Sequence, residues 1–318
     1  HLVLPVGLDP LASARLGDHR SVVSWARLVW LLPMAWLLSG CQQPPRPVAP
    51  DLRHAPMAAD LAAMIRDEMA DKKLSALSIA VLDGDQLVWS QAFGEARAGE
   101  RARRDTVFRV GSISKLFSAT AVMQQVERGA VRLDQPVVER LDSFRPSGDG
   151  AEGITLRHLL THHAGLVREP PAGNYFYAAD ESLEESVDSL AKTALVAAPG
   201  ELFKYSNAGA AVGGRVVEVA AGRAFAEEIR EAILRPLGLE STSFDPLPSV
   251  RRRAADAVMW TMDGRETPAP RFDLGMVPAA NLYSTAEDLV QFARTWFVGA
   301  ARDEDRALLS EASKSPAS

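Results

Sequence analysis

The first part of the folded chain has one helix-like and two strand-like patterns. Apolar residues recur at helical spacing over residues 61–73, which predicts an amphipathic helix. Residues 77–82 and 87–93 are β-favouring and flank Asp83-Gly84-Asp85. Because an Asp-Gly pair supplies the positive φ angles of a tight hairpin, we expect two antiparallel strands here. A two-stranded ribbon is marginal by itself, so more strands must come from elsewhere in the chain.

The later pattern is mostly helical. A strand-like segment, residues 107–111, leads into a helical pattern that starts at Ser112 and runs to Gly129. Further helices are expected over residues 156–162, 208–221, 225–234 and 284–297. The last of them starts with Ser284-Thr285-Ala286-Glu287, which is a capping box. Strands followed by helices indicate a mixed α+β fold rather than a doubly wound sheet.

Composition excludes several classes of protein. The 318 residues, of which 47% are hydrophobic, suffice for one large domain or two smaller ones, and they exclude a disordered chain. Lys and Arg total 35 against 41 for Asp and Glu, which gives a net charge of −6, and the longest basic run is residues 251–253. A surface that follows phosphates is therefore not indicated, and we expect no nucleic-acid partner.

The N-terminal region has the order of an export signal. Arg20 and Arg27 precede an apolar run, residues 28–38, that is too short to span a bilayer comfortably. Residues 38–41, Leu-Ser-Gly-Cys, resemble a bacterial lipobox, in which the cysteine is lipidated and becomes the new N-terminus. Cys41 is the only cysteine, so no disulfide is expected. The alternative, a buried thiol in an internal helix, fits poorly with the flanking arginines and the prolines that follow.

These features predict three regions. Residues 1–41 form the export signal with its lipobox, with an extension upstream of Arg20 left open. Residues 42–57 are rich in proline and form an extended tether, and residues 58–318 form the folded domain. We therefore expect an exported protein that is lipid-anchored through Cys41 and faces the periplasm.

A Ser-x-x-Lys motif, Ser112 to Lys115, occurs where the strand-like segment becomes a helix. Side chains at i and i+3 share one helix face, and the positive end of the helix dipole favours an alkoxide and disfavours a protonated lysine. Burial against Leu116 and Phe117 favours the neutral amine that a general base requires. We predict that Ser112 is a nucleophile and Lys115 its base. The alternative is a capping serine followed by an ordinary helix lysine.

A second Ser-x-x-Lys match, Ser189 to Lys192, follows an acidic stretch with no strand before it. We interpret this one as a solvated helix face.

Tyr205 and Asn207 form the chain's single Tyr-x-Asn, just before a helix of small residues. A tyrosine hydroxyl that faces Ser112 and Lys115 can relay a proton to a leaving group. An asparagine amide can bind a substrate carbonyl or orient the lysine. The alternative is a solvated loop tyrosine followed by an asparagine cap.

Three histidines, His158, His162 and His163, raise the possibility of a metal site or a catalytic triad. No Glu follows His158, no cysteine completes a tetrahedral set, and the Gly-x-Ser-x-Gly of Ser-His-Asp hydrolases does not occur. We expect neither a metal nor a cofactor, and we interpret the histidines as structural residues near the wall of the cleft.

In this order, the motifs resemble the serine β-lactamase-like family, which includes class C β-lactamases, penicillin-binding proteins and related esterases. The segments that carry the resemblance are residues 108–115, 154–166, 205–207, 236–239 with Thr242, and 284–289. The resemblance implies an antiparallel sheet flanked by helices, built from both chain ends, with a mainly helical region inserted. It also implies that Ser112 is acylated, that Lys115 is its base, that Tyr205 shuttles a proton and that Asn207 orients the substrate.

One motif of this family has no counterpart in the chain. Relatives carry Lys-Thr-Gly or His-x-Gly on a later strand, which also supplies an oxyanion-hole amide beside the Ser112 N–H. Here no histidine follows His163, and Lys314 is the only lysine after Lys204. We therefore expect the domain to lack its C-terminal strands.

Two functions follow from these observations. The first is a serine hydrolase that acts on a β-lactam, a D-alanyl peptide from peptidoglycan or a small ester. The second is a catalytically inactive, truncated or cell-wall-binding lipoprotein.

Overall fold

The computed structural model describes residues 47–176, 181–245, 248–270, 273–297, 308–310 and 313. The predicted export signal, Cys41 and Lys314 lie outside these residues. Within the predicted tether, Val48 exchanges two backbone hydrogen bonds with Ser90, and the first helix begins at Ala55. The described end of the tether therefore packs on the domain.

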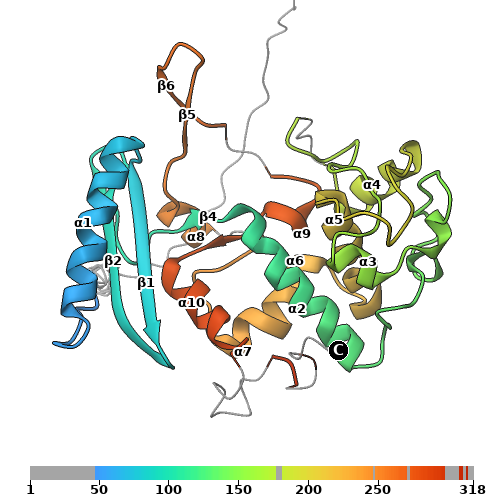
Figure 1. The fold of residues 1–318 in the computed structure, drawn as a ribbon, viewed down its shortest axis with the longest axis horizontal. Coiled ribbons are helices and arrows are strands. Elements are labelled where there is room, and N and C mark those ends of the chain that lie inside the picture. Colours follow the sequence, from blue (N-terminus) through green and yellow to red (C-terminus); the bar gives the residue numbers. More distant parts are fainter. Residues whose placement is uncertain are drawn as a thin grey trace, which may run out of the picture. The chain divides into compact units, whose positions relative to one another are not determined.

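The N-terminal layer is a helix on a three-stranded antiparallel sheet. Helix α1 (Ala55–Asp71) precedes strands β1 (Ala76–Asp83), β2 (Gln86–Arg97) and β3 (Glu100–Arg101), which pair in the order β1-β2-β3. Figure 1 shows α1 along one side of the sheet, where a small apolar cluster is centred on Trp89. Helix α10 (Ala286–Arg294) also contacts β1. The predicted hairpin is confirmed.

The turn of this hairpin depends on a glycine. Asp83 pairs with Gln86, which leaves two residues in the turn, and Gly84 adopts a φ of +61°. A side chain rarely adopts this left-handed angle, so the Asp-Gly pair in the sequence located the turn correctly.

A short strand leads directly to the Ser-x-x-Lys motif. Strand β4 (Phe108–Arg109) pairs with β7 (Tyr283–Ser284), and a 3₁₀ turn (Gly111–Ile113) joins it to helix α2 (Ser114–Glu127). The sequence pattern predicts a helix that starts at Ser112. In the structure, the α-helix begins at Ser114, and Ser112 belongs to the 3₁₀ turn before it. Gly111, with a φ of +53°, lets the chain turn sharply from the strand into the 3₁₀ turn.

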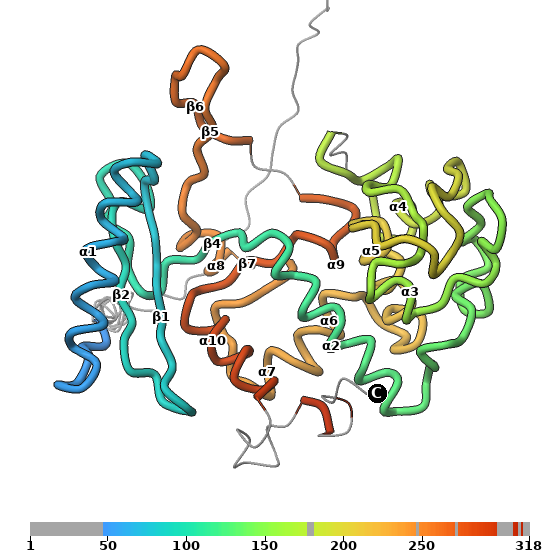
Figure 2. The backbone as a smooth tube through the Cα atoms, in the orientation of Figure 1, coloured from blue at the N-terminus to red at the C-terminus, as the bar shows by residue number. Residues whose placement is uncertain are grey.

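The other elements form a mainly helical region and a small hairpin. Their bounds are α3 (Leu156–Leu160), α4 (Leu183–Asp188), α5 (Asn207–Ala221), α6 (Phe225–Ile229), α7 (Arg235–Leu237), α8 (Pro248–Arg253), β5 (Val258–Trp260), β6 (Glu266–Pro268) and α9 (Val277–Ala280). Helix α5 is central, because it packs against α2, α3, α4, α6 and α9. Figure 2 shows α2 passing from β4 into this region. The predicted α+β class is confirmed.

Two predicted helices differ in detail. The segment predicted as one helix over residues 225–234 is α6 followed by a π-helical turn (Arg230–Leu234). The cap of α10 is Thr285, which accepts a hydrogen bond from the Asp288 N–H, whereas Ser284 belongs to β7. Pairing with β4 therefore moves the predicted start of this helix. Among the described helices, none has the length and apolar character needed to cross a bilayer.

Candidate active site

The structure brings Ser112 and Lys115 together at the start of α2. The Lys115 Nζ lies 3.1 Å from the exposed Ser112 Oγ. The same amine donates to the backbone carbonyl of Ala279 in α9 at 2.8 Å. A neutral amine has two hydrogens and one lone pair, so it can donate to Ala279 and direct its lone pair at the serine hydroxyl. No sequence pattern indicates this carbonyl.

The surroundings of Lys115 favour its neutral form. Burial of the amine lowers the pKa of Lys115 below the ordinary lysine value. Tyr205 and Glu169 oppose this effect and raise the pKa, while Arg168 lowers it further. The net direction is downward, so more of the amine is available as a base near neutral pH than in a solvated lysine.

Tyr205 completes a hydrogen-bonded cluster with the motif. Its hydroxyl lies 2.7 Å from Ser112 Oγ and donates to it. The Lys115 Nζ lies 4.9 Å from the Tyr205 ring centroid, and the Arg168 guanidinium lies 5.6 Å from the same centroid. Ser112 Oγ therefore lies within hydrogen-bond reach of both predicted proton carriers.

The ring of His162 packs against the ring of Tyr205. The two ring centroids lie 4.6 Å apart, and the His162 carbonyl accepts from the Lys204 N–H at 2.7 Å. His162 Nδ1 accepts from the Ser206 N–H at 3.3 Å, which requires an unprotonated Nδ1. Burial, with the charges of Lys115 and His163, lowers the pKa of His162 and favours that neutral form.

His158 caps the N-terminus of α3. Its Nδ1 accepts from the Thr155 N–H at 3.3 Å, while Thr155 Oγ1 accepts from the His158 N–H, so the two residues cap α3. No cluster of three potential metal ligands occurs among the residues that the structure describes.

Asn207 begins α5 and is buried. Its Nδ2 donates to Glu169 Oε1 at 2.7 Å. We had not singled out Glu169, because a lone glutamate in a loop has no pattern that separates it from other charged residues. Only the fold brings it into contact with Asn207 and close enough to Lys115 to affect the pKa of that amine.

The second Ser-x-x-Lys match corrects one of our predictions. Ser189 is only 8% exposed, and its hydroxyl donates to the Ser186 carbonyl at 2.6 Å and accepts from the Ala172 N–H at 3.2 Å. The interpretation as a solvated face is wrong for Ser189, because the 3₁₀ turn that follows α4 directs it into the interior. Lys192 is exposed, as predicted.

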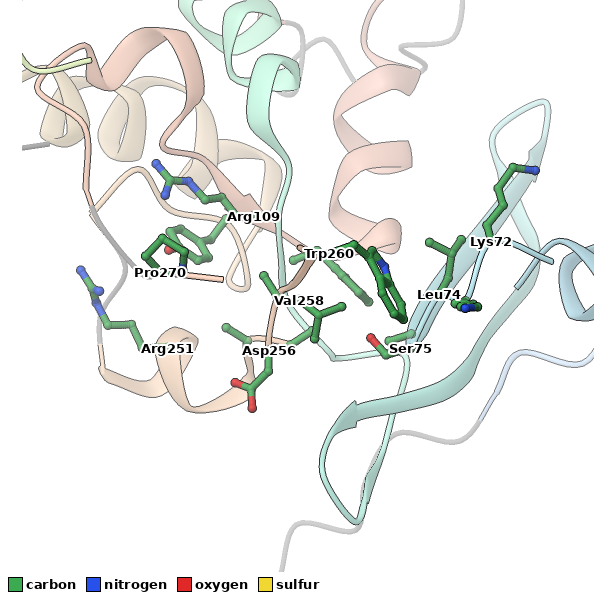
Figure 3. A pocket seen from close by; sticks show the side chains of 16 residues that line it. Lys72, Leu74, Ser75, Arg109, Arg251, Asp256, Val258, Trp260 and Pro270 are labelled. Carbon is green, nitrogen blue, oxygen red and sulfur yellow. The ribbon is translucent and has the colours of Figure 1, made fainter. Parts of the chain in front are cut away.

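A cavity of about 490 Å³ lies at the start of β1, beside β4 and the β5–β6 hairpin (Figure 3). Its lining includes Arg109, Tyr283 and Trp260, and the Lys73 amine is 4.9 Å from the Trp260 ring centroid. The hydroxyl of Ser112 does not line it. The candidate active site therefore rests on the hydrogen-bonded cluster and not on this cavity.

Comparison with known proteins agrees with the motifs. The profile of the beta-lactamase family matches residues 61–318. The chain is 30% identical to penicillin-binding protein 4 of Amycolatopsis lactamdurans over 75% of its own length and 63% of that protein. It is 31% identical to esterase EstB of Burkholderia gladioli, over 77% of the chain and 71% of the esterase. The chain thus spans less than two thirds of the first of these relatives.

The fold is also similar to that of a penicillin-binding protein homologue. The octameric penicillin-binding protein homologue from Pyrococcus abyssi superimposes with a TM-score of 0.70 and 28% identity, over 81% of this chain and 59% of that one. Since the family profile covers most of the chain, and the esterase match exceeds two thirds of both sequences, the chain belongs to the beta-lactamase family.

Proposed function

We propose that the protein is a serine hydrolase that cleaves an amide or ester through an acyl-enzyme on Ser112. The observation that carries this proposal is the position of Ser112 Oγ, 3.1 Å from Lys115 Nζ and 2.7 Å from the Tyr205 hydroxyl. A nucleophile in contact with a base and a second proton carrier is the arrangement that acyl transfer requires.

Acylation starts with proton transfer from Ser112 to the neutral Lys115 amine. The serine oxygen forms a bond to the carbonyl carbon of the substrate, and the C=O electron pair moves to oxygen. When this tetrahedral intermediate collapses, the bond to the leaving group breaks. Tyr205 donates its hydroxyl proton to the leaving nitrogen or oxygen and recovers a proton from Lys115, whose amine lies close to the tyrosine ring.

Deacylation reverses these roles. Water loses a proton to the same pair of groups and attacks the acyl carbon, and the ester bond to Ser112 then breaks. The hydroxyl of Ser112 regains its proton, which restores the starting state. Because both half-reactions use the same proton carriers, loss of either one slows both steps.

The names of relatives indicate which substrate classes to test. Their names include an esterase and a penicillin-binding protein, so small esters, D-alanyl peptides and β-lactams are the compounds to compare. We propose that one of these classes is turned over through Ser112.

The experiment that tests this proposal is covalent labelling followed by intact-mass measurement. A fluorophosphonate ester and a fluorescent penicillin should each be tried on the wild-type protein, on Ser112→Ala and on Ser189→Ala. We expect a single adduct on the wild type with at least one probe. Ser189 is a matched control, because it is the serine of the other Ser-x-x-Lys sequence and is buried.

The adduct should disappear in Ser112→Ala and persist in Ser189→Ala. Absence of any adduct on the wild type, or labelling that survives in Ser112→Ala, contradicts the proposal. Binding to peptidoglycan without turnover of any ester or β-lactam also contradicts it and supports a non-catalytic protein.

A further inference from the structure

We propose that Glu169 is a positioning residue of this site, which holds the Asn207 amide in one orientation and sets the charge around Lys115. The inference rests on the proposed function, because it concerns how the Ser112 and Lys115 pair is organised.

Backbone hydrogen bonds connect residues 167–168, which precede Glu169, to the start of α5. The Arg168 carbonyl accepts hydrogen bonds from the N–H groups of Asn207 at 2.7 Å and Ala208 at 3.1 Å. The Ser206 hydroxyl donates to the Val167 carbonyl at 2.7 Å. The residue after Arg168 therefore has a fixed backbone position relative to the amide of Asn207.

The side-chain contact determines which way the amide points. A carboxylate can only accept hydrogen bonds, so the Asn207 nitrogen must face Glu169, at 2.7 Å, and Oδ1 must point elsewhere. A neutral amide in place of Glu169 would accept either orientation of Asn207. The two orientations of the Asn207 amide have nearly the same shape, and the negative charge of Glu169 selects one of them.

The contact between Glu169 and Asn207 is largely buried, and each side chain has one buried oxygen without a hydrogen-bond partner among the described residues. The side chain of Glu169 is 17% exposed, and its Oε2 is buried. Asn207 Oδ1 is buried as well, and neither oxygen has a hydrogen-bond partner among the described residues. Buried acceptors of this kind cost free energy, and in native proteins they call for a specific reason, such as a role in catalysis.

The charge of Glu169 also acts on the base. The charged and titratable groups that act on Lys115 are Tyr205 and Glu169, which raise its pKa, and Arg168, which lowers it; His162 also interacts with Lys115. Arg168 Nε lies 3.3 Å from Glu169 Oε1. Removal of the carboxylate charge takes away one of the interactions that raise the pKa of Lys115, so that pKa should fall further. Since Lys115 acts as a base when neutral, the acid limb of kcat/KM should move to lower pH.

The test compares Glu169→Gln, Glu169→Asp and the wild type in pH profiles of kcat/KM with whichever ester or β-lactam the wild type hydrolyses. In Glu169→Gln we expect the plateau to fall about ten-fold, as loss of one oriented hydrogen bond implies, and the acid limb to move to lower pH. Glu169→Asp keeps the charge but shortens the side chain, so its plateau should fall while its acid limb stays in place.

Glu201→Gln is the matched control. Glu201 lies on the loop before Tyr205, and its carboxylate accepts from the Ala198 N–H at 3.1 Å. The substitution removes the same charge without touching Asn207. Neither the plateau nor the acid limb should change.

A double variant separates the two effects. If Glu169 acts through Asn207, then Glu169→Gln should lower the plateau little further in an Asn207→Ala background, while the acid-limb shift should persist. Additive plateau losses, an unchanged Glu169→Gln profile, or a shifted acid limb in Glu169→Asp would overturn the inference. Labelling at Ser112 in these variants keeps the two proposals apart, because labelled protein with an unchanged profile refutes this inference alone.

Discussion

At the residue scale, Lys115 has two contacts that a surface lysine lacks. Its amine donates to the Ala279 carbonyl and lies in contact with Ser112 Oγ. The carbonyl fixes the amine in place, and burial lowers the pKa of Lys115. Position and protonation state therefore both suit a base.

The first prediction concerns Lys115→Arg. A guanidinium is not deprotonated in proteins, so it cannot take the Ser112 proton. We expect kcat/KM to fall by about 10²- to 10⁴-fold, the usual contribution of general base catalysis. The measurement is initial rates with the substrate that the wild type turns over.

Lys192→Arg is the control, because it makes the same change in the second Ser-x-x-Lys sequence, where the lysine is exposed. Its rates should match the wild type. Near-wild-type activity in Lys115→Arg would show that another group removes the serine proton.

Local spacing was enough to predict the contact between Ser112 and Lys115. Two side chains at i and i+3 around a helix start lie on one helix face, so they are close enough to meet. The contact of Glu169 with Asn207 joins separate segments, and no local pattern indicates it. The same holds for the Ala279 carbonyl that accepts from Lys115.

At the element scale, α5 lies against α9 through a glycine. A Cβ on Gly214 would lie 2.1 Å from Pro278 Cγ and 2.7 Å from Pro278 Cβ. Pro278 precedes Ala279, whose carbonyl holds Lys115. The close approach of these two helices therefore positions the base.

The second prediction is that Gly214→Ala destabilises the protein and lowers its activity. The clash should displace α9, with a loss of about 1–3 kcal/mol in the free energy of unfolding, as is usual for overpacking. Chemical denaturation and kcat/KM measure the two effects.

Gly213→Ala is the matched control in the same helix. A Cβ there would meet only Val122 Cγ2, at 3.9 Å, which is an ordinary contact. This variant should keep its activity and gain up to about 1 kcal/mol from the better helix propensity of alanine. Equal effects of the two substitutions would contradict the packing argument.

The third prediction concerns the connection between α2 and α6. Glu228 is only 3% exposed, and its carboxylate accepts from Arg128 at 2.8 Å and Gln125 at 3.1 Å and pairs with Arg223 at 3.2 Å. Glu228→Gln should cost about 2 kcal/mol, since charged hydrogen bonds are lost. The two arginines are half-exposed and can be hydrated, which limits the loss.

Thermal or chemical unfolding measures this change. Glu227→Gln is the control, because Glu227 is half-exposed and lies 3.9 Å from Arg230. It should change stability by less than about 1 kcal/mol. A loss in Glu228→Gln no larger than that of the control would mean that the cluster does not stabilise the helix pair.

Element types were easier to predict than element contacts. The hairpin of β1 and β2 and the end of α5 at Gly222 follow from local signals, an Asp-Gly turn and a glycine after an apolar helix. The pairing of β4 with β7 joins distant segments and moves the predicted helix cap from Ser284 to Thr285. The burial of Ser189 depends on how the turn after α4 packs, which the local pattern does not contain.

At the scale of the whole molecule, the N-terminal sequence implies a place in the cell. We propose that the protein is exported and anchored by lipid on Cys41, on the basis of the basic residues, the apolar run and the lipobox-like Leu-Ser-Gly-Cys. Acyl chains on one cysteine give firm anchoring, because each buried methylene contributes about 0.8 kcal/mol.

The fourth prediction is that Cys41→Ser moves the protein from the membrane fraction to the soluble fraction. The full chain, expressed in a bacterium that processes lipoproteins, should incorporate labelled fatty acid, and the variant should not. Ser112→Ala serves as the control, since it should abolish acylation by the substrate and leave the membrane fraction unchanged. Equal distribution of Cys41→Ser and the wild type would refute the anchor.

The α+β class, the family motifs and the pairing of Ser112 with Lys115 could be predicted from the chain, because each depends on local spacing or on several motifs in one order. The hydrogen bond from Tyr205 to Ser112, the contact of His162 with Tyr205 and the contact of Glu169 with Asn207 became visible in the folded protein. These contacts join segments far apart in the chain. Their distances are set by how α2, α5 and α9 pack, and a one-dimensional pattern does not contain that packing.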